Sequence, residues 1–325
     1  MKKLVVLFAA GILLFAACQK TATHEEPVLP EEEIVSDARK CAANEVLEEQ
    51  LKADPGLRQR MDEIETFTRR FVDNPAISRI VGDVMEVPVV VNVLYNTTAQ
   101  NISNEQIESQ INIINADFAA TNSDYGNTPA IFQGVLSGNT KIRFVLEGTN
   151  RKFTSKASWT TNDAMKKSSQ GGIDPTNPTT TLNMWVCNLG GGILGYAQFP
   201  GGSSTTDGIV LDDNATGNTG TAAAPYGLGR TATHEIGHYF NLRHIWGDSR
   251  CGNDFVDDTP LHDAANYGCP PDGHKSKCKG RNIEMTMNYM DYTDDACMYM
   301  FSTGQKTRML AVFASGGPRN SFAQP

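Results

Sequence analysis

The sequence has little positive charge, few histidines and no internal repeat of solenoid length. Its 325 residues include 28 Lys or Arg against 37 Asp or Glu, which gives a formal net charge of −9 at pH 7, and only 6 His. An acidic chain lacks the electrostatic footprint of a nucleic-acid-binding protein. Hydrophobic residues make up 40% of the chain and charged residues 20%, which excludes a coiled coil, a collagen-like repeat and a multi-span membrane protein. We therefore expect a globular protein with no nucleic-acid partner.

An apolar run over residues 4–15 lies near the N-terminus, after two lysines. It is too short for a mature membrane-spanning helix, which needs about 20 apolar residues, and two alanines follow it as in a cleavage site. These alanines and Cys18 resemble a bacterial lipobox, so we predict a signal peptide over residues 1–17 and a lipid on Cys18. A plain secretory signal is the alternative. Either way we expect an exported protein, a cell-envelope lipoprotein or a secreted one, that meets a membrane only through this lipid.

Hydrophobic periodicity predicts a domain of the α/β or α+β class. Residues 19–37 are polar and rich in Glu and Pro, as in a tether, and a helical pattern from Cys41 to Phe71 is broken once, at Pro55 and Gly56. Further on, β-branched runs predict strands, and a three- and four-residue spacing predicts helices between and after them. The predicted strands are Val87–Tyr95, Ile142–Leu146, Leu182–Val186 and Ile209–Leu211, and the predicted helices are Ser103–Phe118 and Thr303–Phe313.

The most informative segment is a histidine motif. His234 and His238 are four residues apart, so a helix would place both imidazoles on one face. Glu235 follows the first of them, which gives the H-E-x-x-H pattern of zinc peptidases. His244 comes six residues after His238, so the helix must end and reverse between them, and Asn241 tolerates the left-handed conformation that such a turn needs.

Three readings of this motif are possible. The histidines could be hydrogen-bonded residues of an ordinary helix, or they could belong to a closed structural zinc site. A catalytic site is favoured, because three ligands beside a carboxylate leave the fourth position of the metal open. A zinc ion there would lower the pKa of water to about 7, and Glu235 would accept the proton as general base.

Three segments resemble the metzincin metallopeptidases, and among them the pappalysin family. They are HEIGHYFNLRH with the following IWGD, the upstream NLGGGILGYAQFPGG, and the downstream NYMDYTDDACMYMFSTGQKTRM. The family pattern usually has Gly at the position of Asn241. The resemblance implies a secreted zinc endopeptidase that acts on polypeptides. It also implies two subdomains. The upper subdomain, a twisted sheet with two main helices above the cleft, would end near residue 243, and a loop-rich lower subdomain would cover residues 244–325.

The resemblance also assigns residues around the cleft. Met290 matches the Met-turn beneath the metal, and Tyr292 matches a tyrosine that could stabilise the developing oxyanion. The glycines from Gly190 to Gly195 would form the upper rim. Asp294 and Asp295 lie where the family forms its primed-side pocket, and an acidic pocket pairs with Arg. We therefore expect cuts on the N-terminal side of Arg, with Asp295 as the first choice for the pocket residue.

The seven cysteines suggest disulfides and a zymogen. Four of them cluster late, and the resemblance implies the pairs Cys251–Cys278 and Cys269–Cys297, although the sequence alone allows three pairings or a second zinc site. Cys41 resembles a cysteine switch, whose thiolate fills the open zinc position in a latent enzyme; a Cys41–Cys187 disulfide is the alternative. We therefore predict a tether and propeptide over residues 18–59 and a catalytic domain over residues 60–325.

Oxygen donors are dense just after the zinc motif. Asp254, Asp257 and Thr259 suit Ca²⁺ rather than zinc, and the family resemblance also implies calcium in this loop. A solvated acidic loop is the alternative. The alternative to the enzyme as a whole is a non-catalytic surface lipoprotein that binds peptides through zinc, but such a protein would have no need for Glu235.

Overall fold

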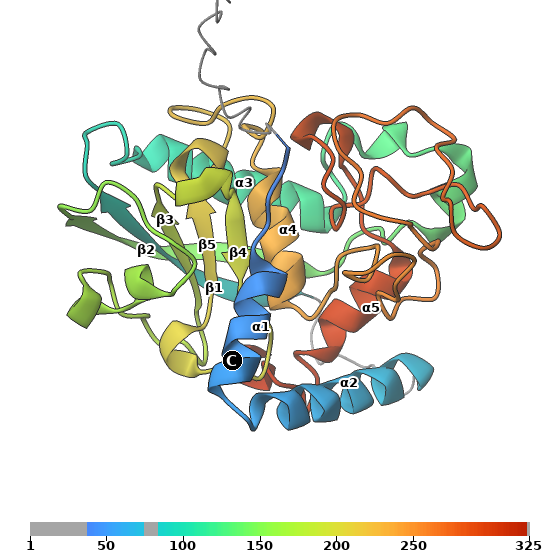
Figure 1. Cartoon of the computed structure of the whole chain (residues 1–325), viewed down its shortest axis with the longest axis horizontal. Helices are drawn as coiled ribbons and strands as arrows, with labels where there is room; N and C mark the ends of the chain where they lie inside the picture. The colour runs from blue at the N-terminus through green and yellow to red at the C-terminus, as the bar shows by residue number, and fades with distance from the viewer. Residues whose placement is uncertain (1–37, 75–83, 324–325) are drawn as a thin grey trace, which may run out of the picture. The chain divides into compact units, whose positions relative to one another are not determined.

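The computed structural model describes residues 38–74 and 84–323 (Figure 1). The predicted signal peptide, Cys18 and the predicted tether over residues 19–37 lie outside the described residues. Within the described part of the chain, no helix is both long and apolar enough to cross a bilayer.

A five-stranded sheet forms the centre of the fold, in the order β2-β1-β3-β5-β4. Strands β1, β2, β3 and β5 are parallel, and β4 is an antiparallel edge strand on β5. Parallel strands are buried on both faces, which explains why they read as apolar, β-branched runs. The four predicted strands are confirmed, and β2 extends beyond the prediction through polar residues that pair with β1. The bounds are β1 Met85–Tyr95, β2 Ile142–Phe153, β3 Leu182–Cys187, β4 Gly195–Ala197 and β5 Ile209–Asp212.

Two helices pack against this sheet and against each other, α3 (Asn104–Ala119) and α4 (Arg230–Tyr239). Helix α3 begins where predicted, because the Ser103 side chain accepts a hydrogen bond from the backbone N–H of Gln106. Every residue of α4 is buried. Phe118 of α3 contacts Phe240 at the end of α4, with ring centroids 6.2 Å apart, and this packing fixes the helix that carries the histidines.

Regular structure is sparse after Phe240 (Figure 1). One helix closes the chain, α5 (Thr303–Ala311), and it begins with a capping box made by Ser302 and Gln305. Two disulfides join the intervening loops with the pairing that the resemblance implies, Cys251–Cys278 and Cys269–Cys297. The metzincin-like arrangement of a sheet with helices and a loop-rich, disulfide-stapled second part is therefore confirmed.

The predicted N-terminal helical pattern forms two helices. Helix α1 (Ala43–Ala53) contacts β4, and helix α2 (Leu57–Asp73) contacts α5. The chain breaks between them at Pro55 and Gly56, as predicted. The residues that precede α1 run along β4 and lead to the candidate site (Figure 1).

Candidate metal centre and cleft

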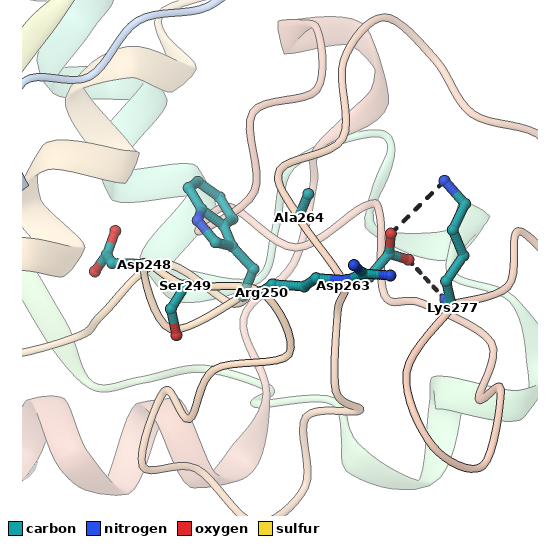
Figure 2. A pocket seen from close by; sticks show the side chains of 7 residues that line it. Asp248, Ser249, Arg250, Asp263, Ala264 and Lys277 are labelled. Carbon is teal, nitrogen blue, oxygen red and sulfur yellow. Dashed lines mark hydrogen bonds and ion pairs between the residues drawn. The ribbon is translucent and has the colours of Figure 1, made fainter.

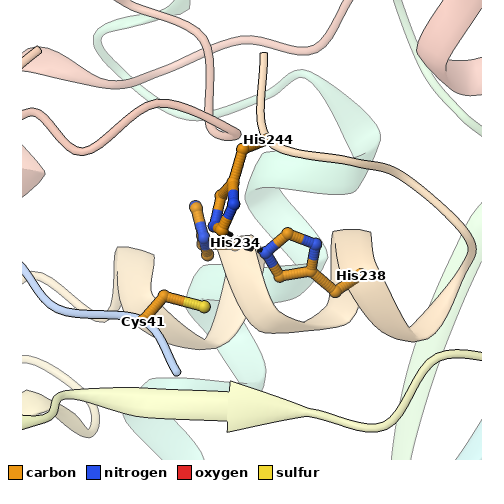
Figure 3. A group of neighbouring side chains, drawn as sticks. All are labelled: Cys41, His234, His238 and His244. Carbon is orange, nitrogen blue, oxygen red and sulfur yellow. Dashed lines mark hydrogen bonds between the residues drawn. The ribbon is translucent and has the colours of Figure 1, made fainter. Parts of the chain in front are cut away.

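Helix α4 and the turn after it bring three histidines to one point (Figure 3). His234 and His238 lie one turn apart on α4, and the chain then reverses at Asn241, whose φ of 73° is left-handed. The reversal returns His244 to the same point. The Nε2 atom of His238 lies 3.2 Å from that of His234 and 3.0 Å from that of His244.

Each of the three imidazoles donates its Nδ1 hydrogen to an oxygen, which turns its Nε2 toward the other two. Burial lowers the pKa of His234 and of His238 well below the ordinary value, so both are neutral. The lone pair on Nε2 of His238 lies about 3 Å from the Nε2 atoms of the other two histidines, and such close nitrogens repel unless a cation lies between them, so the three nitrogens fit a metal ion. The acceptors are the carbonyl of Tyr289 for His234 (2.6 Å), the carbonyl of Leu242 for His238 (2.8 Å) and the carboxylate of Asp248 for His244.

Cys41 adds a fourth ligand atom (Figure 3). Its Sγ and the three histidine nitrogens all lie within 4.8 Å of one another. Among the described residues, these four side chains form the group that could hold a metal ion. The segment around Cys41 runs parallel to β4: the N–H of Leu194 donates to the carbonyl of Lys40 (2.9 Å), and that of Ala42 donates to the carbonyl of Gly195 (3.0 Å). Three imidazole nitrogens and one sulfur are a donor set typical of tetrahedral zinc.

Glu235 lies directly beside this point and has a free oxygen. The side chain is fully buried, and burial raises the pKa of its carboxyl to about 8. The Cys41 thiol donates to Oε2 (3.4 Å), whereas Oε1 has no hydrogen-bond partner among the described residues. A Cβ at Gly195 would lie 3.2 Å from Oε1, so the glycine of β4 leaves room for this oxygen.

Met290, the residue assigned to the Met-turn by resemblance, packs against α4. It is fully buried, and its carbonyl accepts a hydrogen bond from the N–H of Ile245 (3.1 Å). A Cβ at Gly237 would lie 2.4 Å from the Met290 sulfur. The glycine inside the histidine motif is therefore needed for the sulfur to approach α4.

Aromatic rings and one carboxylate surround the third histidine. The Tyr292 ring lies 4.9 Å from that of His244, and the Tyr292 hydroxyl donates to the carbonyl of Cys41 (2.9 Å). Trp246 stacks on His244, with centroids 4.3 Å apart and planes at 8°. Trp246 and Asp248 were not predicted as site residues, although both lie in the IWGD sequence that follows the motif.

Asp295 is buried and holds an arginine from the N-terminal segment. The Nη2 of Arg39 pairs with Asp295, Nη1 donates to Thr231 (3.2 Å) and Nε donates to the carbonyl of Thr293 (3.1 Å). The guanidinium also lies over the Tyr226 ring, 4.9 Å from its centroid. The sequence analysis named Asp295 but missed Arg39, whose only signal was its position two residues before Cys41.

Several nominated residues are not gathered at this site. The carboxylate that Arg39 binds is that of Asp295, not that of Asp294, which is half-buried. Asp254 is buried and accepts from the Thr259 hydroxyl (2.8 Å), but Asp257 is exposed. Cys187 is buried at the end of β3, and both it and Cys41 are free thiols, so the alternative disulfide between them is not formed.

A surface pocket adjoins the metal centre through Asp248 and Trp246 (Figure 2). An ion pair between Asp263 and Lys277 (3.8 Å) lies at one side of it, and Arg250 adds another positive charge. The lining therefore carries both signs of charge, and it does not by itself define a ligand.

Comparisons with known proteins agree with this geometry. A family model described as Peptidase_M43, pregnancy-associated plasma protein-A, matches residues 182–314. An extracellular metalloprotease of Pyricularia oryzae is 34% identical over 227 residues, which cover 67% of this chain and 70% of that protein. Extracellular metalloprotease 1 of Coccidioides posadasii is 33% identical over 248 residues, which cover 70% and 78%.

Two solved structures from Tannerella forsythia are similar over most of their length. Mature mirolysin in complex with a cleaved peptide is 43% identical, with a TM-score of 0.72, and the match covers 74% of this chain and 96% of that chain. A promirolysin mutant is 39% identical, with a TM-score of 0.79 and coverage of 87% and 97%.

Proposed function

Since this chain belongs to the pappalysin family of metallopeptidases, we propose that Glu235 is its general base and that the protein is exported as an Arg-directed zymogen. The chain is a zinc metalloendopeptidase, and polypeptides are its substrates. The observation that carries the proposal is the buried Glu235 oxygen, which is left without a partner beside three converging histidine nitrogens.

The residues of the cleft can be assigned roles in peptide hydrolysis. His234, His238 and His244 would hold the zinc ion, which would supply Lewis-acid activation of a water molecule and of the substrate carbonyl. Glu235 takes a proton from the attacking water and returns it to the leaving amine. Tyr292 donates a hydrogen bond to the oxyanion; its hydroxyl already donates to a peptide carbonyl, that of Cys41, at 2.9 Å.

A zinc-dependent binding protein is the alternative, and the site disfavours it. A binding protein has no use for a carboxylate at this position, and burying the unpartnered Oε1 of Glu235 costs free energy. A reaction that needs a proton acceptor explains why a carboxylate with an unpartnered oxygen is buried here.

Arg39 supports a preference for Arg on the primed side of the cut. Its guanidinium binds the Asp295 carboxylate, a hydroxyl and a carbonyl, and it lies over the Tyr226 ring. A lysine ammonium could not reach all three acceptors from one position. We expect a mass-spectrometric map of cuts in a denatured protein mixture to show Arg directly after the cleaved bond, with Lys at least about tenfold rarer. Cuts at positions unrelated to Arg would overturn this preference, but the assignment of the chain as a peptidase would stand.

Residues 39–42 support latency, because they occupy the groove between β4 and the Met-turn segment. Arg39 fills the Asp295 pocket, Cys41 lies at the metal centre, and the intervening backbone pairs with β4. A substrate needs all three places. The thiol of Cys41 would bind zinc as a thiolate, although burial raises the pKa of this thiol well above the ordinary value.

Cys41→Ala is expected to release activity from the uncut chain. Loss of the sulfur removes one of the two side-chain anchors, so cleavage of a peptide with Arg after the cut should rise at least about tenfold over the wild-type chain. Cys187→Ala is the matched control, because it removes an equally buried free thiol away from the histidines. Equal latency in both variants would remove Cys41 from its proposed role.

The end of the propeptide is better placed after α2 than at the predicted boundary between residues 59 and 60. That boundary falls in the first turn of α2, which continues to Asp73. The match to mature mirolysin covers a smaller share of this chain than the match to promirolysin. N-terminal sequencing of the processed protein would locate the cut.

Export rests on the N-terminal signal pattern and on the relatives, which are named extracellular metalloproteases. The lipid on Cys18 stays a prediction. Globomycin sensitivity of processing in a bacterial host would separate a lipoprotein from a protein with a plain signal.

Calcium at Asp254, Asp257 and Thr259 is a further part of the proposal. Asp254 and Thr259 already touch, and burial raises the pKa of Asp254 to about 6. A nearby cation would offset the cost of ionising that carboxyl. Calcium should therefore raise the melting temperature of the wild-type protein, and the Asp254→Asn protein should not respond.

Asp254→Asn is expected to stabilise the calcium-free protein above pH 6. A carboxyl with a raised folded-state pKa lowers the free energy of unfolding as the pH rises from about 4 to about 6, by about 3 kcal/mol in total here. Asn keeps both contacts, accepting from the N–H of Val256 and donating to Thr259, whose hydroxyl turns to the Val256 carbonyl. Urea unfolding at pH 8 should show the gain and at pH 4 should not. The exposed Asp257→Asn is the control.

A further inference from the structure

Helix α2 packs one face against α5, in the catalytic part of the chain (Figure 1). Leu57, Thr68 and Phe71 are each at most 2% exposed. Thr68 accepts a hydrogen bond from the side chain of Asn241 (3.4 Å), the residue that turns the chain between the second and third histidines. A segment that only had to cover the cleft would not need this contact.

An ion pair joins α2 to α5. Both nitrogens of the Arg308 fork bind Glu65, with Nη1–Oε1 at 3.1 Å and Nη2–Oε2 at 2.8 Å. Arg308 is 2% exposed, and its other acceptors are the carbonyls of Phe255 and Asn241. In the described residues Glu65 is the carboxylate that pairs with this guanidinium. A bidentate pair on a buried guanidinium recognises a carboxylate at one fixed position, although the Glu65 side chain itself is 23% exposed.

Further contacts extend the surface beyond this pair. The Arg60 Nε donates to the carbonyl of Gly201 (2.8 Å), and a Cβ at Gly201 would lie 3.1 Å from the Ile64 side chain. Arg69 of α2 lies over the Phe255 ring, 5.4 Å from its centroid. We define the anchor surface as Gly201, Asn241, Phe255 and Arg308. It offers an arginine, carbonyls and apolar area to helix α2, whose Glu65 pairs with the arginine.

We propose that the anchor surface binds α2 independently of the cleft, so that the propeptide stays bound and inhibitory after its peptide link to the enzyme is cut. This inference rests on the proposed latency. It identifies the ligand of the anchor surface as α2, the amphipathic helix of the same chain. Residues 39–42 and α2 then act as two linked ligands. Each raises the effective concentration of the other, and the pair binds far more tightly than either alone.

The test uses the full chain with one cleavage site for an added protease between Asn74 and Val84. After the cut, the fragment that ends at residue 74 should co-elute with the enzyme in gel filtration, and peptidase activity should stay low. Glu65→Gln should raise the dissociation constant of the fragment by about 30-fold or more, because the Arg308 charge is left unpaired. Activity should then appear on cutting. Glu63→Gln is the matched control, an exposed glutamate two residues away on the same helix.

Two results would overturn the proposal: immediate loss of the wild-type fragment after the cut, or equal retention of the Glu65→Gln and Glu63→Gln fragments. Co-elution is measured in a Glu235→Gln background, so it does not depend on peptidase activity. If no variant cleaves any peptide, the proposed function fails, and the co-elution result still decides whether the anchor surface binds α2.

Discussion

Glu235→Gln is expected to lower peptide cleavage by at least about 1,000-fold while leaving the metal centre intact. Gln has the shape of Glu and fits the same buried space, but it cannot accept the proton of the attacking water. General acid–base catalysis contributes about 10²–10⁴-fold to a rate, and here one residue serves in both proton transfers. The histidine nitrogens keep their Nδ1 partners in the variant, so zinc should still bind.

The measurement compares cuts in a denatured protein mixture by mass spectrometry, after identical limited proteolysis of the wild-type and variant chains. Zinc content is measured on the same samples, and Glu63→Gln serves as the control for loss of a glutamate. Retained cleavage in a Glu235→Gln protein with full zinc would remove the residue from the mechanism. Absence of cleavage in both proteins, with zinc bound, would favour the peptide-binding alternative.

Asp295→Asn is expected to reduce the kcat/KM for a peptide with Arg after the cut by about 100-fold or more. Removing one partner of a buried, hydrogen-bonded charge pair costs about 2–5 kcal/mol. Asn can keep one oxygen toward the N–H groups of Leu228 and Arg230, which Oδ2 of Asp295 now accepts at 2.8 and 3.2 Å. Its amide nitrogen would then face the guanidinium. The fold should survive, and the attraction for Arg should not.

Asp294→Asn is the matched control for this pocket, because it removes the same charge one residue earlier. Peptides with Leu after the cut provide a second comparison, since their cleavage should change little in either variant. An equal effect of both substitutions on Arg peptides would show that general negative charge, rather than Asp295, attracts the substrate. A uniform loss for Arg and Leu peptides would indicate damage to the fold.

The sequence predicts most of the elements that have a local signal. Strands β1, β3 and β5 are short apolar runs because parallel strands are buried on both faces, and His234 and His238 share a face at a spacing fixed by the helix. Strand β4 was missed, because three residues that include a glycine carry no periodicity. Its place at the edge is set by pairing with β5.

The contacts that could not be predicted from the sequence join residues that are far apart along the chain. Arg39 and Asp295 are 256 residues apart, so nothing near either residue indicates the other, and the same holds for Glu65 and Arg308. In the acidic loop, by contrast, closeness in sequence does not place the side chains together. Asp254 and Asp257 are close in sequence, but one side chain is buried against Thr259 and the other is exposed, since a dense run of oxygens does not determine where each side chain points.

The Nδ1 partners of the three histidines differ in whether a substitution can remove them. His234 and His238 donate to main-chain carbonyls, and His244 donates to the side chain of Asp248. A carbonyl of the main chain is present whatever residue occupies the position, so substitutions there leave the acceptor in place. Of these three acceptors, only the carboxylate that holds the third ligand can be removed by substituting its own residue, so a substitution of Asp248 would act directly on the orientation of His244.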